Sequence, residues 1–582
     1  MERLRSLQLF GEVVRLKAVA RAFIPGTGPL ATDGGPRAMP VEPEGFNITN
    51  ELITGMTYFK APEFVRMTQL LMGDDLFWKG LHLYHERYKN ANATSIQWIE
   101  SMEETVKSSG GTLSLKKMAF GWLKRCGHPH VEVKVNYDPE QNSLSVDISQ
   151  SGFESITQTL DQEEKGGPWD FGADFKDPWI FPVTWGVVTD GKYVKEGLYT
   201  VTKAQESFTV KGLDRKPDFL SFARGFSYFG TYTVTTASNS DLALQAMSDP
   251  DLSNRFLAYR SLADQEKARL VELLTKQQAG QQAGQETKLT TDLVSKDYIS
   301  AHTGILFDPN LAGQSKALIC METESIDSRP ALAHQYWTIS KAKNIMYQAV
   351  FESNQKKIVD LFDSIESKNK PGPHKLQIHD RALKGHCLRL MVAKAKEDSS
   401  EKEMAISRSK SLISSAFMTD RIRGLSNYLL LEEPTTRDNE IERFKKEWGV
   451  HMDATEELIG VLSSIDSKDA PALIRSLLKD SIFDINLAGH ARRVVRNWAH
   501  NRKRCVLTDD GLKLTEDLLV TIGKVNQMSA YALLDSFGDI KKFNNDQKQK
   551  MIDCLKAARG RLDAKKETSL YNQIGRLLTS CE

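Results

Sequence analysis

The sequence has no closely spaced cysteines. Its six cysteines lie far apart, and none forms a C-x-x-C pair. This spacing argues against a zinc knuckle and against a small fold stapled by disulfides. It favours a reducing compartment, and we expect the protein in the cytoplasm. The cysteines are Cys126, Cys320, Cys387, Cys505, Cys554 and Cys581.

The sequence also has no excess of one charge and no long apolar run. Its 77 basic and 76 acidic residues leave a formal charge of +1, which gives no global attraction to nucleic acid or to an anionic membrane. No stretch approaches the roughly 20 apolar residues that a membrane-spanning helix needs. We therefore expect no nucleic-acid partner and no membrane span. Residues 1–23 are basic and partly amphipathic, which leaves organelle targeting open, although Glu2 and Glu12 are atypical of a transit peptide.

The pattern of apolar residues divides the chain into three regions. Between residues 40 and 126 apolar residues recur at three- and four-residue spacing, as in Phe64, Met67, Leu70 and Leu71, which predicts helices. Pro62 fits the first turn of one of them. Residues 130–236 alternate apolar and polar residues in short β-branched and aromatic segments, which is typical of a β-sandwich. After Ser238 the helical spacing returns and continues to the end. At 582 residues, the chain is expected to be a multidomain α+β protein.

Several segments stand out in order along the chain: FNITNELITGMTYFKAPEFVRMTQLLMGDDLFWKGLHLYHERY, WIFPVTWGVV, SFTVKGL, FLSFARGFS, SDPDLSNRFLAYRSLA and the stretch from RFKKEW to LYNQIGRLL. In this order they resemble the aminopeptidase N (alanyl aminopeptidase) family of gluzincin zinc metallopeptidases, over its C-terminal two-thirds only. The resemblance implies a remnant of the helical half of a thermolysin-like catalytic domain in residues 1–127, with residues 1–38 matching poorly. It implies an immunoglobulin-like β-sandwich in residues 128–237 and a superhelical, all-α array in residues 238–582. Within the poorly matching part, residues 26–40 are interpreted as an inserted Gly/Pro loop or as mistranslated sequence.

The zinc motif of this family is missing from the sequence. Family members bind zinc with H-E-x-x-H and a further glutamate, and the glutamate of the motif is the general base. None of the 12 histidines is part of such a motif. His82 and His85 share a predicted helix, but no glutamate follows the first, and we interpret them as surface or hydrogen-bonded side chains. We therefore expect no zinc on this chain alone and no activity in isolation. In the family the motif lies upstream of the position of Met1, so a truncated gene model, a separate polypeptide supplying the N-terminal half, or loss of catalysis would each explain its absence.

One residue matches a catalytic residue of the family. Tyr58 in TYFKAPEFVRM corresponds to the tyrosine whose phenol donates a hydrogen bond to the oxyanion of the tetrahedral intermediate. The family usually has Glu and Gly near this tyrosine, where this chain has Phe59 and Ala61-Pro62. From the sequence alone, Tyr58 would be an ordinary half-buried aromatic residue.

The densest positive segment covers residues 490–504, HARRVVRNWAHNRKR. Arg492 matches a family arginine that would pair with the carboxylate of a peptide, which makes it the substrate-binding candidate. The alternative is an amphipathic helix with Val494, Val495 and Trp498 packed inward and the charges in solvent.

Two functions follow from the resemblance. In the first, the chain is the C-terminal portion of a zinc aminopeptidase that removes N-terminal residues from peptides with a free N-terminus. In the second, it is a non-catalytic module of the same family that binds a peptide or a protein partner.

Overall fold

In the described part of the chain, strands occur only between His130 and Val234, and helices form most of the remainder. The computed structural model describes residues 11–25, 28–35, 38–43, 54–153, 174–279, 290–368, 375–396 and 399–581. Two compact units emerge from the contacts: Met1–Ile24 with Gly28–Ala258, and Pro25–Thr27 with Tyr259–Glu582. None of the described helices has the length and apolarity needed to cross a bilayer. The domain boundaries expected at 127/128 and 237/238 stay predictions.

The helices of the first unit begin at well-formed caps. Thr54 accepts a hydrogen bond from the Met56 amide (3.2 Å) and donates its own amide to the Thr57 hydroxyl (3.3 Å), which starts α4. Thr94 and Gln97 form the corresponding capping box of α6. The helices are α2 (Glu12–Ala22), α3 (Pro29–Asp33), α4 (Gly55–Met72), α5 (Asp74–Tyr88), α6 (Ser95–Ser108), α7 (Leu115–Ala119), the π-helical η2 (Phe120–Lys124) and α8 (Asn239–Ser248).

Two expectations for this region are wrong. Pro62 lies in the interior of α4 and not in a first turn, because the Thr54 cap starts the helix seven residues before the proline. Residues 26–40 are not simply an inserted loop, since Pro29 opens the short helix α3, whose Leu30 and Asp33 are buried. Of this segment, residues 26–27 and 36–37 lie outside the described residues.

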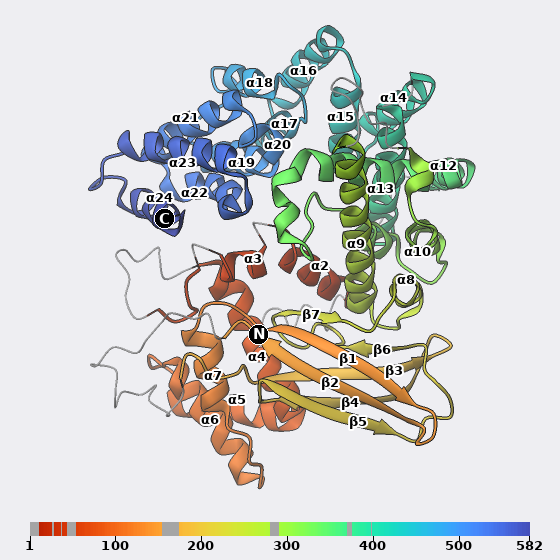
Figure 1. The fold of residues 1–582 in the computed structure, drawn as a ribbon. Coiled ribbons are helices and arrows are strands. Elements are labelled where there is room, and N and C mark those ends of the chain that lie inside the picture. Colours follow the sequence, from red (N-terminus) through yellow and green to blue (C-terminus); the bar gives the residue numbers. More distant parts are fainter. Residues whose placement is uncertain are drawn as a thin grey trace. The chain divides into compact units, whose positions relative to one another are not determined.

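The β-sandwich consists of two sheets, ordered β5-β2-β1-β7 and β4-β3-β6. Strands β1 and β2 form the predicted hairpin, with Asp138 paired to Ser143 across a turn that contains Asn142 at φ 46°. Alternate residues such as Val131 and Val133 point into the core, as the two-residue period requires. Figure 1 shows the strands side by side. They are β1 (His130–Asp138), β2 (Ser143–Ser151), β3 (Phe181–Thr189), β4 (Lys192–Val201), β5 (Gln205–Lys211), β6 (Phe219–Phe222) and β7 (Thr231–Val234).

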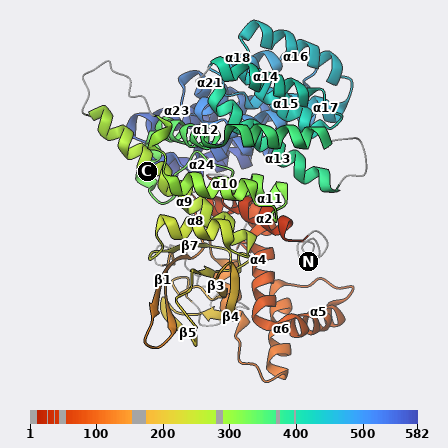
Figure 2. The same ribbon diagram turned by 90° about the vertical axis from the view of Figure 1, so that its right-hand side faces the viewer.

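The second unit is an array of helices, several of which pack pairwise, as α12 does on α13 and α14 on α15 (Figure 2). Fully buried leucines, isoleucines and tryptophans form its core, and Trp448 and Trp498 are among the largest of these side chains. The helices are α9 (Leu252–Ala279), which begins in the first unit, η4 (Thr291–Leu293), α10 (Lys296–Phe307), α11 (Gly313–Ile319), η5 (Pro330–Gln335), α12 (Tyr336–Lys368), α13 (Lys375–Ala395), α14 (Ser399–Ile413), α15 (Met418–Leu431), α16 (Pro434–Trp448), α17 (Met452–Ser464), α18 (Ala470–Leu477), α19 (Ala488–His500), α20 (Arg502–Cys505), α21 (Asp509–Val525), α22 (Gln527–Leu534), η6 (Asp535–Phe537), η7 (Ile540–Lys542), α23 (Asn545–Gly560) and α24 (Thr568–Cys581).

Candidate functional site

Tyr58 lies in the first turn of α4, and its side chain is 61% exposed. An exposed phenol can reach a ligand, whereas the sequence alone predicted a half-buried aromatic residue. Pro62 follows four residues later and has no N–H, so the Tyr58 carbonyl cannot receive its usual helical hydrogen bond. The role of Tyr58 stays a prediction.

The buried side of α4 is held by a charged side chain. Lys60 is fully buried, and its Nζ donates to the carbonyls of Arg125 (2.8 Å) and Gly127 (2.7 Å) and lies 3.0 Å from Asp33 Oδ2. Burial raises the pKa of Asp33 to about 6 and lowers that of Lys60, while their mutual attraction opposes both shifts. These contacts fix the helix from which Tyr58 projects.

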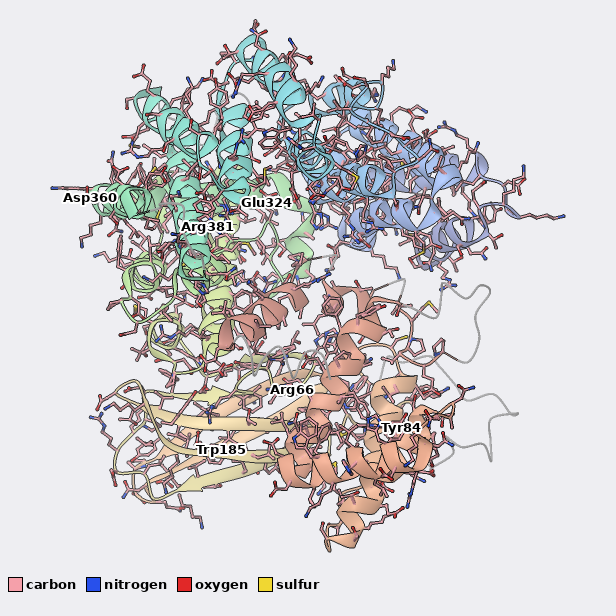
Figure 3. All side chains as sticks on the ribbon, turned by 180° about the vertical axis from the view of Figure 1, so that it is seen from behind. Arg66, Tyr84, Trp185, Glu324, Asp360 and Arg381 are labelled. Carbon is pink, nitrogen blue, oxygen red and sulfur yellow. The ribbon has the colours of Figure 1, made fainter. Side chains whose placement is uncertain are left out.

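A second buried ion pair joins α2 to α4. Arg15 binds Glu63 through both guanidinium ends, at 2.6 and 2.9 Å. Arg15 also donates to the carbonyls of Gly225 and Phe226, both at 2.7 Å, in the segment that follows β6. Arg66, one turn further along α4, donates to the Phe226 carbonyl at 3.0 Å (Figure 3). The helical part of the first unit is thus tied to its β-sandwich by directed hydrogen bonds.

Arg492 lies on the exposed face of α19 in the second unit. The opposite face carries Val494, Val495 and Trp498, all fully buried, so the amphipathic-helix interpretation is confirmed. Most of the surrounding positive charge is balanced by neighbouring carboxylates, through the pairs Arg493–Glu457, Arg502–Asp539, Lys503–Asp466 and Arg504–Asp466. Arg492 itself has no carboxylate partner among the described residues, and its substrate-binding role stays a prediction.

The structure does not bring the two candidate residues into one unit, because Tyr58 belongs to the first and Arg492 to the second. His82 and His85 are exposed on α5, as the surface interpretation requires.

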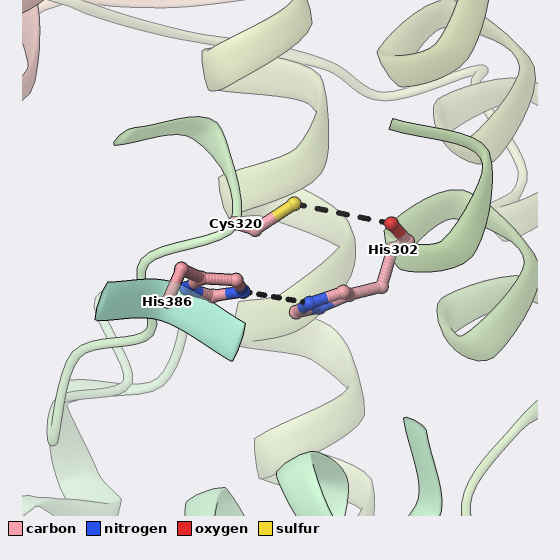
Figure 4. Close-up of side chains that lie close together, drawn as sticks. All are labelled: His302, Cys320 and His386. Atoms are coloured by element: carbon pink, nitrogen blue, oxygen red, sulfur yellow. Dashed lines mark hydrogen bonds between the residues drawn. The ribbon is translucent and has the colours of Figure 1, made fainter. Parts of the chain in front are cut away.

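A buried cluster in the second unit escaped the sequence analysis. The side chains of His302 on α10, Cys320 directly after α11, and His386 on α13 are all buried, and their donor atoms lie within 4.8 Å of one another (Figure 4). The three residues are far apart in the sequence and form no motif of fixed spacing. The sequence gives no local signal for the cluster, because the helices of His302 and His386 also carry charged residues, as α13 does with Lys384 and Arg389.

Comparison with known proteins identifies the family of the second unit. The family described as "Domain of unknown function (DUF3458_C) ARM repeats" matches residues 239–570, which is more than half of the chain. The chain belongs to this family. Its C-terminal helical array is therefore of the ARM-repeat type, and the predicted α+β fold class with such an array is confirmed.

The expected resemblance to aminopeptidase N is also confirmed. Aminopeptidase N of Escherichia coli (strain K12) is 22% identical over 541 residues, which cover 91% of this chain and 58% of that protein. Aminopeptidase N of Caulobacter vibrioides is 26% identical over 235 residues, which cover 40% of this chain and 25% of that protein. The crystal structure of Legionella pneumophila aminopeptidase A in complex with aspartic acid has the same fold, with a TM-score of 0.77, 18% identity, and coverage of 99% of this chain and 61% of that chain. The chain spans less than two thirds of the first of these relatives.

The catalytic zinc of the aminopeptidase N family does not fit the residues of this DUF3458_C chain. Its sequence contains no H-E-x-x-H. Among the described residues, the one group of three side chains able to hold a metal ion is His302, Cys320 and His386, and all three are buried. A hydrolytic zinc needs a coordination position open to water and a neighbouring general base. The cluster offers two histidines and a cysteine, whereas a gluzincin binds zinc with two histidines and a glutamate, so the cluster does not match a hydrolytic zinc site.

Proposed function

We propose that the chain acts as the C-terminal portion of a zinc-dependent aminopeptidase of the aminopeptidase N type. The observation that carries this proposal is the match to E. coli aminopeptidase N, which covers 91% of this chain and 58% of that protein. The zinc ligands and the general base would come from a polypeptide equivalent to the remainder of that relative. The substrates would be peptides with a free N-terminus.

In this proposal the chain contributes positioning and charge stabilisation. The exposed Tyr58 phenol would donate a hydrogen bond to the oxyanion that forms when the scissile carbonyl is attacked. Lys60 and the Arg15–Glu63 pair hold α4 in place, so the phenol would not have to be reoriented during the reaction. Arg492 would bind the carboxylate of the peptide through its guanidinium group.

The test is reconstitution. The purified chain should hydrolyse an alanine or leucine amide no faster than a buffer blank, with or without added zinc. When it is mixed with a polypeptide that carries H-E-x-x-H and corresponds to the first part of aminopeptidase N, zinc-dependent hydrolysis should appear. Turnover by the chain alone, with near-stoichiometric zinc, would overturn the proposal.

Tyr58→Phe tests the assigned oxyanion donor in the reconstituted enzyme. Loss of one such donor lowers kcat by about 10²–10³-fold, and KM should change little. Tyr84→Phe is the matched control, because Tyr84 lies on the neighbouring helix α5, where its ring contacts His85 and Tyr88 (Figure 3). Equal kcat values for Tyr58→Phe and Tyr84→Phe would remove Tyr58 from the mechanism.

The second candidate, a non-catalytic binding module, draws support from the exposed Arg492, which has no carboxylate partner among the described residues, together with the missing zinc motif. It predicts that the chain alone binds a peptide with a free carboxylate and that no partner polypeptide confers hydrolysis. Titration calorimetry on the chain, followed by the reconstitution assay, separates the two functions.

A further inference from the structure

The buried histidine–cysteine cluster has the donors and the spacing of a metal site. His302 Nε2 and His386 Nε2 face each other at 3.0 Å, with ring centroids 5.2 Å apart. Two imidazole nitrogens and one thiolate on a common ion are separated by about 3.4 Å (N–N) and about 3.6 Å (S–N) at ordinary bond lengths. The three donor atoms already lie within 4.8 Å of one another, so shifts of about 1 Å or less would place them around one ion.

We propose that His302, Cys320 and His386 bind a single Cu⁺ ion. This site is separate from the hydrolytic zinc of the aminopeptidase N family and does not depend on the proposed function. Since α10, the end of α11 and α13 each supply one donor, the ion would fasten these three helices together (Figure 4).

A chain of hydrogen bonds fixes which nitrogen of His302 is free to bind the ion. At its far end Glu322, paired with Lys267 at 3.6 Å, accepts a hydrogen bond from the Tyr298 hydroxyl (3.0 Å). The Tyr298 oxygen in turn accepts from the Tyr259 hydroxyl (3.0 Å). The Tyr259 oxygen is then left to accept from His302 Nδ1, at 2.7 Å. Because Nδ1 carries the proton, His302 Nε2 presents a lone pair to the cluster, as in the carboxylate–histidine–metal arrangements of known metal sites.

The state of the second histidine is also suited to binding. Without a metal, His386 Nε2 must donate its proton to the lone pair of His302, because one of two facing nitrogens has to be the donor. His386 Nδ1 is buried without a hydrogen-bond partner among the described residues. This nitrogen is therefore free to take up the proton when Nε2 binds the ion.

The charge balance and the geometry both select Cu⁺ over Zn²⁺. Two neutral imidazoles, one Cys320 thiolate and Cu⁺ give a site with no net charge, whereas Zn²⁺ would leave a buried charge of +1. Arg389 beside His386 and Lys316 beside Cys320 add to that cost, whereas the Glu322 carboxylate near Cys320 offsets part of it. The head-to-head histidines suit an ion that accepts two or three ligands, and thiolate with imidazole is a donor set for soft Cu⁺.

Binding of Cu⁺ to the three side chains involves no oxidation or reduction and is accounted for by proton movements alone. The Cys320 thiol loses its proton to solvent as the S–Cu bond forms. The His386 proton moves from Nε2 to Nδ1, and His302 keeps its proton on Nδ1. One proton is therefore released for each ion bound.

The experiment uses the full chain under anaerobic, reducing conditions, with Cu⁺ supplied in competition with a chromogenic Cu⁺ chelator. We expect one Cu⁺ per chain, release of one proton per ion, and retention of Cu⁺ against an equal concentration of Zn²⁺. Cys320→Ser and His386→Gln should each lower the affinity at least tenfold. Cys387→Ser is the matched control, because Cys387 is also fully buried on α13, next to His386 in sequence, and lies outside the cluster.

If a variant fails to fold, X-ray absorption spectroscopy of the copper-loaded wild-type chain still tests the proposal. The expected copper shell contains one sulfur and two nitrogen neighbours. A shell without sulfur, displacement of Cu⁺ by Zn²⁺, unchanged binding in folded Cys320→Ser, or less than a tenth of an ion per chain would each overturn the proposal.

Discussion

Two carboxyl groups of the first unit and one of the second have pKa values shifted in opposite directions. In the first unit, burial raises the pKa values of both Asp33 and Asp249 to about 6. In the second unit, burial also raises the pKa of Glu324, but the attraction of Lys343 and Lys503 outweighs it and holds the pKa well below its usual range. Burial alone therefore does not decide whether a carboxyl group stays charged.

The partners of each carboxyl group explain the difference. In the described part of the chain, the hydrogen bonds to the Asp249 carboxylate come from uncharged donors, among them the Ser221 hydroxyl (3.0 Å) and the Gln245 amide (2.9 Å). Glu324 has Lys343 at 2.6 Å and Lys503 at 3.1 Å (Figure 3). The attraction of two cations outweighs the free-energy cost of desolvating a carboxylate, whereas uncharged hydrogen-bond donors compensate only part of that cost. Asp33 lies between these cases, with the single cation Lys60.

The largest expected effect comes from Glu324→Gln. This change leaves the partly buried Lys343 without the Glu324 carboxylate, whereas Lys503 keeps Asp466, so the free energy of unfolding of the second unit should fall by about 1.5–3 kcal/mol at pH 7. Native-state hydrogen exchange of the α12 amides would measure the loss. Glu352→Gln is the control, because Glu352 pairs with Lys394 at the half-exposed surface, where about 1 kcal/mol or less is expected. Equal losses in both variants would show that burial does not matter here.

The sequence predicted most of the architecture because its elements have strong local signals. The two-residue period of β1 and β2 and the turn after Asp138 are local properties of the chain, and the hairpin forms as predicted. The helix start before Pro62 was missed because Thr54 is a cap only in combination with Thr57, a weaker pattern than a proline. The helix at Pro29 was missed because its burial depends on Lys60, a distant residue.

The buried polar groups of the second unit could not be predicted for the same reason. Glu324, in the segment between α11 and η5, meets Lys503 of α20 only through tertiary packing. His302, Cys320 and His386 likewise share no fixed spacing. Periodicity identifies which face of a helix is buried, but it does not identify which residue of another helix lies opposite.

The next prediction concerns the pH dependence of the first unit. The folded pKa of Asp249, about 6, exceeds its ordinary value of 3.8, so between these pH values the folded state binds more protons than the unfolded state. The contribution of Asp249 to the free energy of unfolding is then largest at low pH and falls as pH rises from about 4 to about 6. The slope is about 1.4 kcal/mol per pH unit at most.

Asp249→Asn should remove this contribution. Because other groups also titrate in this range, the measured quantity is the difference between wild type and variant in urea unfolding at pH 4, 5 and 6. Asp75→Asn, at an exposed aspartate in the first turn of α5, is the control and should leave the slope unchanged. Parallel pH profiles for Asp249→Asn and wild type would contradict the raised pKa.

The smallest effect on stability is expected at Arg492. Its side chain is exposed and has no carboxylate partner in the described part of the chain, so Arg492→Ala should change the free energy of unfolding of the second unit by about 0.5 kcal/mol or less.

The proposed role of Arg492 concerns binding. A charge-assisted hydrogen bond contributes about 1.5–3 kcal/mol, so the affinity for a peptide carboxylate should fall about tenfold or more. Arg493 lies on the same helix as Arg492, and Arg493→Ala, which breaks its pair with Glu457 of α17, should leave that affinity unchanged. The buried face of α19 would then stabilise the fold, and the exposed guanidinium of Arg492 would bind the peptide. Equal affinities for the two variants would mean that the helix has a structural role only.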